Sequence, residues 1–205
     1  MAFLGLDFIV SSILLLCLVF IVVFIFRERL KKLVYGRSSF DLFLSKLKTY
    51  LELNYPKTSF NFDIIEKSKI EDNPTTRKYL IVDNIISQYT SLTLDSSKFP
   101  SGTPANLHWK GYAFLSEPDK NKLPKDWVQR KQALLTRDKN CCFRCGKSIT
   151  ISNMDIHMIR DINKGGKYFL ENLLPVCKDC FKLLNNQKLN HITIKDDLYD
   201  IVKTT

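Results

Sequence analysis

The chain has 205 residues, a length that allows one domain with attachments or two small domains. Its 31 Lys and Arg residues outnumber its 21 Asp and Glu residues, which gives a formal net charge of +10 at pH 7. The sequence contains no G-x-x-x-x-G-K-[ST], G-x-S-x-G or G-x-G-x-x-G motif. It therefore offers no support for a P-loop, a nucleophile elbow or a dinucleotide-binding turn.

An uncharged apolar run occupies residues 8–26, which read FIVSSILLLCLVFIVVFIF. As a helix this run would be about 28 Å long, close to the ~30 Å hydrocarbon core of a bilayer. A cleaved signal peptide is the alternative, but it would place basic residues before a shorter apolar core, whereas only Asp7 precedes this one. We therefore predict a retained transmembrane anchor within residues 1–26.

A basic juxtamembrane segment, residues 27–37, follows the apolar run. The positive-inside rule places such a segment on the cytoplasmic side, where it can also contact anionic lipid headgroups. The sequence thus predicts a single-pass protein of a bacterial inner (cytoplasmic) membrane, with its C-terminal domain in the cytoplasm. The basic residues concerned are Arg27, Arg29, Lys31, Lys32 and Arg37.

Residues 38–94 are expected to form a small α+β region to which no chemistry can be assigned. Residues 38–56 show helical spacing of apolar side chains, with Ser38 or Ser39 as the start and Pro56 beyond the end. Residues 59–64 read SFNFDI, and this alternation predicts a short strand. Residues 75–89 again have helical spacing, and the apolar side chains of both helices are expected to form core.

A linker is predicted over residues 95–126, because residues 95–106 are rich in Ser, Pro and Gly and a second loop follows. Residues 120–147 overlap its end and hold nine basic residues against two acidic ones, which supplies +7 of the net charge. Such a block suits a polyanion, and we predict contacts with DNA phosphates and little base specificity. A solvated basic surface is the alternative. The candidate contacts are Arg130, Lys131, Arg137 and Lys139.

Two Cys-x-x-Cys pairs lie in the last third of the chain. Four thiolates at this spacing are typical of a tetrahedral structural Zn²⁺ site. Two disulfides are the alternative, which a reducing cytoplasm would disfavour. Cys141 could replace its neighbour Cys142, but the two-residue spacing favours Cys142. The predicted zinc ligands are therefore Cys142, Cys145, Cys177 and Cys180.

Three segments of the last third together resemble the zinc-stapled HNH endonuclease family. They read DWVQRKQALLTRDKNCCFRCGK, DIHMIRDINKGG and ENLLPVCKDCFKLLN, and the resemblance covers residues 127–190. It implies a ββα-metal finger that contains a strand, a returning loop with Gly-Gly and Asn, and a helix that begins near the second Cys pair. It also implies phosphodiester cleavage in DNA with a second, divalent ion such as Mg²⁺ or Mn²⁺. Residues 191–205 would form a C-terminal tail.

The resemblance assigns roles to residues of this centre one by one. His157 takes the position of an ion ligand, and Asn172 the position of the residue that orients the general base. The base position itself holds Met158, whose thioether cannot accept a proton near neutral pH. The position after the last Cys holds Phe181, which cannot ligate a hard cation. The sequence therefore predicts an HNH centre whose hydrolytic chemistry is impaired.

Two arrangements could rescue that chemistry. Asn185 stands one helical turn beyond Phe181 and could join His157 and Asp155 around an ion. Alternatively, a strand shifted by one residue would make His157 the base, although such a shift reverses the facing of every side chain. His157 could also be an ordinary hydrogen-bonded structural histidine.

The fold class expected from the sequence is α+β, with an N-terminal transmembrane helix, the small middle region and a C-terminal HNH-like zinc domain. The expected function is that of a membrane-anchored HNH-family protein that binds or cuts DNA. The alternative is a non-catalytic zinc module that mediates protein–protein contacts in a membrane complex.

Overall fold

The computed structural model describes the backbone of residues 2–112, 122–185 and 192–205. Within the first helix it describes the side chains of residues 12–13, 15–16, 18–21, 23–24, 26–27 and 39 onward. Lys120 of the basic block and most of the juxtamembrane basic side chains lie outside this part, as do residues 186–190 of the predicted HNH-like segment. The chain divides into two compact units, Met1–Ser45 with Thr205 and Lys46–Thr204, and each is described by itself.

The first unit consists mainly of helix α1 (Ala2–Asn54), which continues into the second unit. The helix does not begin at Ser38 or Ser39, as the sequence suggested, because the helical backbone runs unbroken from Ala2. It ends before Pro56, as expected. Its predicted apolar face is buried at Phe40, Phe43, Leu47 and Leu51.

The prediction of a membrane anchor is wrong. A helix needs about 20 consecutive, predominantly apolar residues to cross a bilayer. Over the described residues, no helix combines the required length with the required apolar character. The transmembrane helix of the predicted fold class and the single-pass inner-membrane localisation are corrected accordingly.

The middle of the chain is helical in the structure, with α2 (Ile64–Lys67) and α3 (Pro74–Ser91). The predicted strand at residues 59–64 does not form, because the backbone of Asn61 finds its partners in a side chain. Gln88 Oε1 accepts the N–H of Asn61, and Gln88 Nε2 donates to its carbonyl, each at 2.8 Å. Asn73 caps α3 by accepting from the N–H groups of Thr75 and Thr76.

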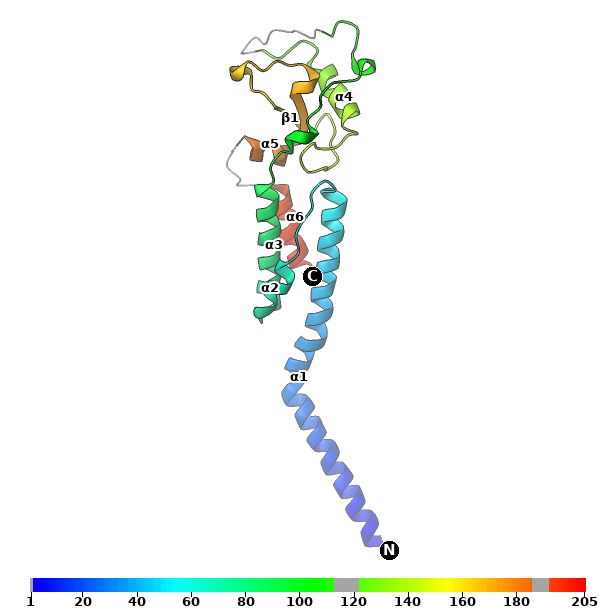
Figure 1. Ribbon diagram of the computed structural model, residues 1–205. Coiled ribbons are helices and arrows are strands. Elements are labelled where there is room, and N and C mark those ends of the chain that lie inside the picture. The colour runs from blue at the N-terminus through cyan, green and yellow to red at the C-terminus, as the bar shows by residue number, and fades with distance from the viewer. Residues whose placement is uncertain (1, 113–121, 186–191) are drawn as a thin grey trace. The chain divides into compact units, whose positions relative to one another are not determined.

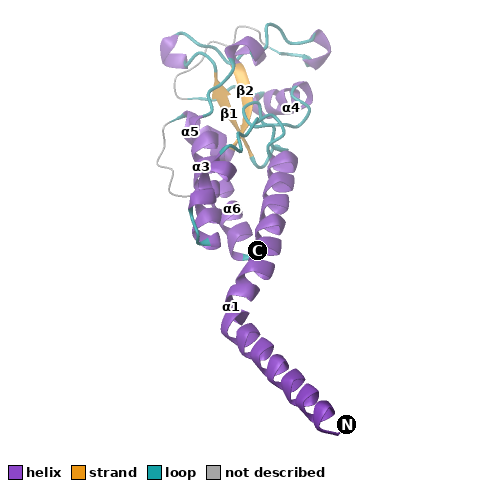
Figure 2. Ribbon diagram, turned by 60° about the horizontal axis from the view of Figure 1, so that its bottom comes forward, coloured by secondary structure: helices purple, strands orange, loops and turns teal. Residues whose placement is uncertain are grey.

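The second unit also contains α4 (Trp127–Arg137), strands β1 (Met154–Met158) and β2 (Leu173–Cys177), α5 (Lys178–Leu184) and α6 (Thr193–Lys203). The strands pair antiparallel from Met154 opposite Cys177 to Met158 opposite Leu173. The hairpin lies between α4 and α5 (Figures 1 and 2). Strand, loop, strand and helix follow the order that the HNH resemblance implies.

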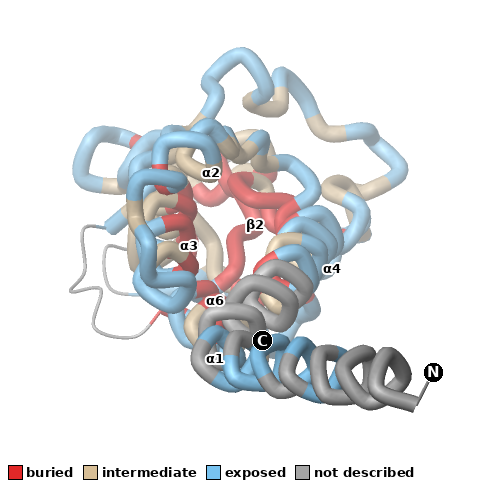
Figure 3. Tube along the Cα trace, turned by 90° about the horizontal axis from the view of Figure 1, so that it is seen from below, coloured by how far each residue is buried: buried red, intermediate tan, exposed pale blue. Residues whose placement is uncertain are grey.

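Helix α6 lies beside α3 (Figure 1) and forms within the segment expected to be a tail. Its buried side chains recur every fourth residue at Ile194, Leu198 and Val202. Strand β2 is buried along its whole length, and the inner face of α3 is buried with it (Figure 3). A core cluster of Ala133, Leu134, Tyr168, Leu170 and Leu173 joins α4 to the hairpin.

Candidate metal centre and nucleic-acid interface

The four predicted zinc ligands converge on one point. The sulfur atoms of Cys142, Cys145, Cys177 and Cys180 all lie within 4.8 Å of one another, and all four residues are buried. Cys145 Sγ and Cys177 Sγ are 3.9 Å apart, far beyond a disulfide bond of about 2.05 Å. Thiolates around a tetrahedral Zn²⁺ with Zn–S bonds of ~2.3 Å stand about 3.8 Å apart. The cluster thus fits a structural zinc ion, and Cys141 is outside it, as predicted.

The turn that carries the first Cys pair is fixed by short-range hydrogen bonds. Cys142 N–H donates to Lys147 O at 2.8 Å, and Gly146 N–H donates to Cys142 O at 2.9 Å. Gly146 has a left-handed backbone with φ +82°, and a Cβ there would lie 2.8 Å from the backbone nitrogen of Lys57. Glycine is therefore required where the turn meets the chain that leaves α1.

Hydrogen bonds among the cysteines lower the pKa of the Cys142 thiol, with Cys145 as the largest contributor, and raise the pKa of the Cys145 and Cys177 thiols, so the four sulfurs titrate as one group. The deprotonated thiolate is the form that ligates a metal. The side chains present thus suit Zn²⁺, which would be held by two residues of the turn, one at the end of β2 and one in the first turn of α5. With four protein ligands the ion would be structural and would supply no catalytic position.

Asn172 is buried and holds the loop between the strands. Its Oδ1 accepts the N–H of Arg160 at 2.8 Å, and its Nδ2 donates to Arg160 O at 2.9 Å and Lys167 O at 2.8 Å. The loop is tight, since a Cβ on Gly166 would lie 1.8 Å from Arg160 O. The bonds of the Asn172 side chain thus go to loop backbone, and its predicted role in orienting a base remains a prediction.

His157 and Met158 point to opposite faces of β1, because successive strand residues alternate. Met158 packs with Ile156 against the α4 core cluster. His157 is half-buried on the other face, and burial lowers the pKa of its imidazole, which favours the neutral form. The residue at the predicted base position is therefore a partly buried side chain that packs against the core cluster.

Asp155 and Asn185, the other predicted ion ligands, lie in different surroundings. Asp155 lies on the same face of β1 as His157. Asn185 is exposed, and its Nδ2 donates to Phe181 O at 2.9 Å. In the described segments, the four cysteines form the only group of three or more His, Cys, Asp or Glu residues with converging ligand atoms. The roles of His157 and Asn185 at a second ion remain predictions.

Two of the four residues predicted to contact DNA form hydrogen bonds within the protein instead. Arg130 is completely buried and forms a two-point ion pair with Asp126, at 2.8 and 3.0 Å. Arg137 donates to Leu170 O at 2.6 Å and Leu173 O at 2.8 Å and pairs with Asp138. The sequence treated these arginines as surface charge, whereas their guanidinium groups bind acceptors of the protein itself. Lys139 is exposed and Lys131 is half-buried.

Sequence reasoning missed two residues that touch the metal ligands. Tyr89 Oη lies 3.2 Å from Cys180 Sγ, and Arg144 Nη1 donates to the same sulfur at 3.4 Å. Tyr89 belongs to α3, more than fifty residues before the Cys pairs, and its apolar spacing indicated only a core position. Arg144 lies inside the first Cys-x-x-Cys pair, and that position is the one signal that could have drawn attention to it.

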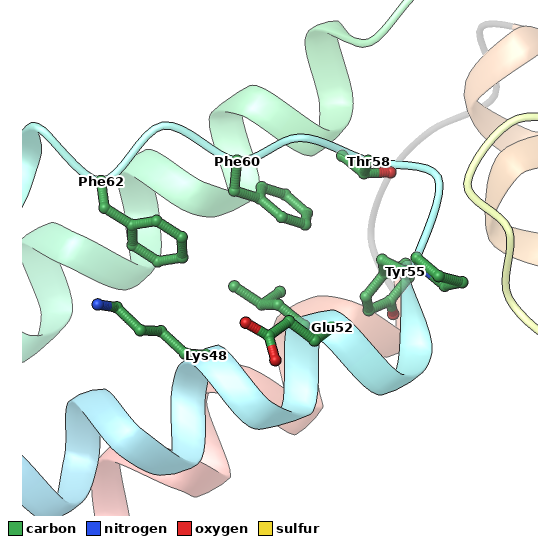
Figure 4. A pocket seen from close by; sticks show the side chains of 8 residues that line it. Lys48, Glu52, Tyr55, Thr58, Phe60 and Phe62 are labelled. Carbon is green, nitrogen blue, oxygen red and sulfur yellow. The ribbon is translucent and has the colours of Figure 1, made fainter.

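A cavity of about 310 Å³ lies between the end of α1 and the following loop (Figure 4). Phe60 and Phe62 from the loop face the helix, and Lys48 Nζ lies 5.4 Å from the centre of the Phe62 ring. Glu52 stands beside Lys48 on the helix. The lining combines apolar rings with one lysine and one glutamate, and none of the predicted site residues contributes to it.

Comparison with known proteins gives one match. Residues 142–187 match the model of the family described as HNH endonuclease, a segment that covers the cysteine cluster, both strands and α5. No curated protein and no solved structure matches the chain significantly. Sequence, hairpin and cysteine geometry agree with the match. Residues 142–187 thus match the HNH endonuclease family model, and their cysteine cluster fits a structural zinc site, which suggests a metal-binding, nuclease-type or DNA-related function.

Proposed function

We propose that this protein binds DNA through its HNH scaffold and has lost most or all of the hydrolytic chemistry. One observation carries the proposal: Met158, at the position of the general base, packs against the core cluster and faces away from His157. Neither its chemistry nor its direction suits proton transfer from water. The loss of a general base alone costs about 10²–10⁴-fold in rate.

The ligand set of a hydrolytic ion is also depleted. Burial lowers the pKa of His157, which favours the neutral imidazole that ligates metals, but the Phe181 side chain has no ligand atom and Asn185 Nδ2 donates to Phe181 O. A divalent ion bound in the finger would polarise phosphate and activate water. A single imidazole with one carboxylate on the same strand face is a weak site for such an ion.

Support for DNA binding comes from the HNH match and from lysines that the fold leaves on the surface. Asp126 and Asp138, the acidic residues of the block, are paired with Arg130 and Arg137, so these four charges cancel in pairs. The guanidinium of Arg144 is buried. Among the other described basic residues of the block, Lys125 and Lys139 are exposed and Lys131 is half-buried.

Binding can be tested with a fluorescent duplex and the full zinc-loaded chain over a range of salt concentrations. Phosphate contacts release counterions, so log affinity should fall linearly with log salt. Lys131→Gln with Lys139→Gln should reduce the slope by up to about two and weaken all sequences alike. Lys67→Gln with Lys69→Gln, in and just after α2, is the matched control and should change neither. Salt-independent binding, or equal effects of both pairs, would refute the DNA interface and favour a protein-contact module.

A further inference from the structure

Cys180 receives two hydrogen-bond contacts from outside the cysteine cluster. Tyr89 is completely buried, and its Oη lies 3.2 Å from Cys180 Sγ. A ligating thiolate has no proton to donate, so the Tyr89 hydroxyl is the donor to a metal-bound Cys180. Arg144 Nη1 donates to the same sulfur at 3.4 Å. One zinc ligand is thus hydrogen-bonded by a helix outside the matched HNH segment.

The Arg144 side chain also caps the C-terminal end of α3. Its Nη2 donates to Tyr89 O at 2.7 Å and to Leu92 O at 2.8 Å, and its Nε donates to Leu92 O at 3.1 Å. The last turn of α3 has no basic residue of its own. A cation at this end satisfies carbonyls that lack helical partners and opposes the negative end of the helix dipole.

The charge of Arg144 requires compensation because the residue is 6 % exposed. Its hydrogen-bond acceptors are backbone carbonyls and one sulfur, and no carboxylate of the described residues is among them. Four thiolates around Zn²⁺ carry a net charge of −2. The zinc–thiolate group therefore supplies the negative charge that a buried guanidinium needs.

We infer that Tyr89 and Arg144 are positioning residues of the metal centre, which tune the Cys180 thiolate and make the docking of α3 depend on zinc. Hydrogen bonds to a ligating sulfur lower its charge density and fix its orientation, and loss of such partners costs about 10–100-fold in metal affinity. The coupling also runs in the other direction. Without zinc, Arg144 would lose its compensating charge and the end of α3 would be held less tightly.

The test uses the full chain and three substitutions, Tyr89→Phe, Arg144→Lys and Arg144→Gln. The dissociation constant for Zn²⁺, measured by competition with a chromogenic chelator, should rise about 10-fold or more for Tyr89→Phe and Arg144→Gln. Arg144→Lys keeps the charge and should retain part of the affinity. Tyr79→Phe, the same change on an exposed turn of α3, is the matched control and should leave the constant unchanged.

Two further readouts separate electronic tuning from general destabilisation. With Co²⁺ in place of zinc, loss of the Tyr89 donor should shift the sulfur-to-cobalt charge-transfer band to lower energy, whereas Tyr79→Phe should not. Hydrogen exchange of the wild type should show that zinc removal exposes the amides at the end of α3. An unchanged band and zinc affinity in Tyr89→Phe, loss of folding of this variant at saturating zinc, or α3 protection that is independent of zinc would overturn the inference. None of these outcomes depends on DNA binding or cleavage.

Discussion

Arg130 provides a sharp test because the sequence predicts a DNA contact there and the structure shows a buried structural residue. Its guanidinium pairs with Asp126 at two points, donates to Tyr168 O and lies 4.8 Å from the centre of the Tyr112 ring. Arg130→Met keeps much of the volume but leaves the Asp126 carboxylate and a carbonyl without these donors. Removal of one partner of a buried ion pair costs about 3–5 kcal/mol. Asp126 retains 19 % exposure and can be partly hydrated, so we expect about 3 kcal/mol.

The measurement is urea unfolding of the zinc-loaded protein, combined with DNA affinity under conditions in which every variant is folded. Lys131→Met, one residue along α4, is the matched control and should change the free energy of unfolding by less than about 0.5 kcal/mol. The two variants should show opposite profiles: Arg130→Met loses stability and keeps DNA affinity, whereas Lys131→Met keeps stability and loses affinity. Adding Asp126→Asn to Arg130→Met should recover part of the loss. The reasoning is falsified if Arg130→Met costs less than about 1 kcal/mol and weakens DNA binding as much as Lys131→Met does.

Other substitutions test the metal site, the loop and the strand. Cys177→Ser should lose zinc by elemental analysis and its fold by circular dichroism, because zinc binding contributes on the order of 10 kcal/mol to the free energy of folding. Cys141→Ser, the control, should keep both the metal and the fold. Gly166→Ala places a Cβ 1.8 Å from a backbone oxygen and should cost about 2 kcal/mol or more in urea unfolding, whereas Gly102→Ala, with open space around it, should cost little. Burial lowers the pKa of His157, so the unfolded chain binds the proton at higher pH than the folded chain does. Stability should therefore fall as pH drops through about 6.5, and less so in His157→Gln; equal pH profiles would contradict this assignment.

Much of the centre could be predicted because its signals are local. The spacing of Cys142, Cys145, Cys177 and Cys180 was sufficient to identify the metal ligands, and the Gly-Gly and Asn positions indicated the loop between the strands. Helix α3 was also predicted from the spacing of its apolar residues. These features depend on residues a few positions apart, which the sequence displays directly.

The remaining features depend on partners far apart in the chain. Phe60 and Phe62 alternate like a strand, but Gln88, on α3, supplies the hydrogen bonds of the intervening residue. Arg130 donates to Tyr168 O and Arg144 to Cys180 Sγ, each more than thirty residues away. Charge counting therefore included both arginines in a basic block without showing that they bind groups of the protein itself. In the sequence alone, residues 8–26 have the length and the apolar character expected of a membrane-spanning helix. In the structure, these residues belong to a 53-residue helix that continues to Asn54.

The central claim is that the zinc-stapled HNH scaffold binds DNA without cutting it. The most direct measurement incubates supercoiled plasmid with excess zinc-loaded protein in Mg²⁺ or Mn²⁺ at low salt, and follows binding and nicking in the same samples. His157→Ala is the matched control for metal-dependent chemistry. The account predicts that wild-type protein binds the plasmid and leaves it as supercoiled as His157→Ala does. Nicking by the wild type at an enzyme-like rate, abolished in His157→Ala, would contradict the account and assign the base to His157.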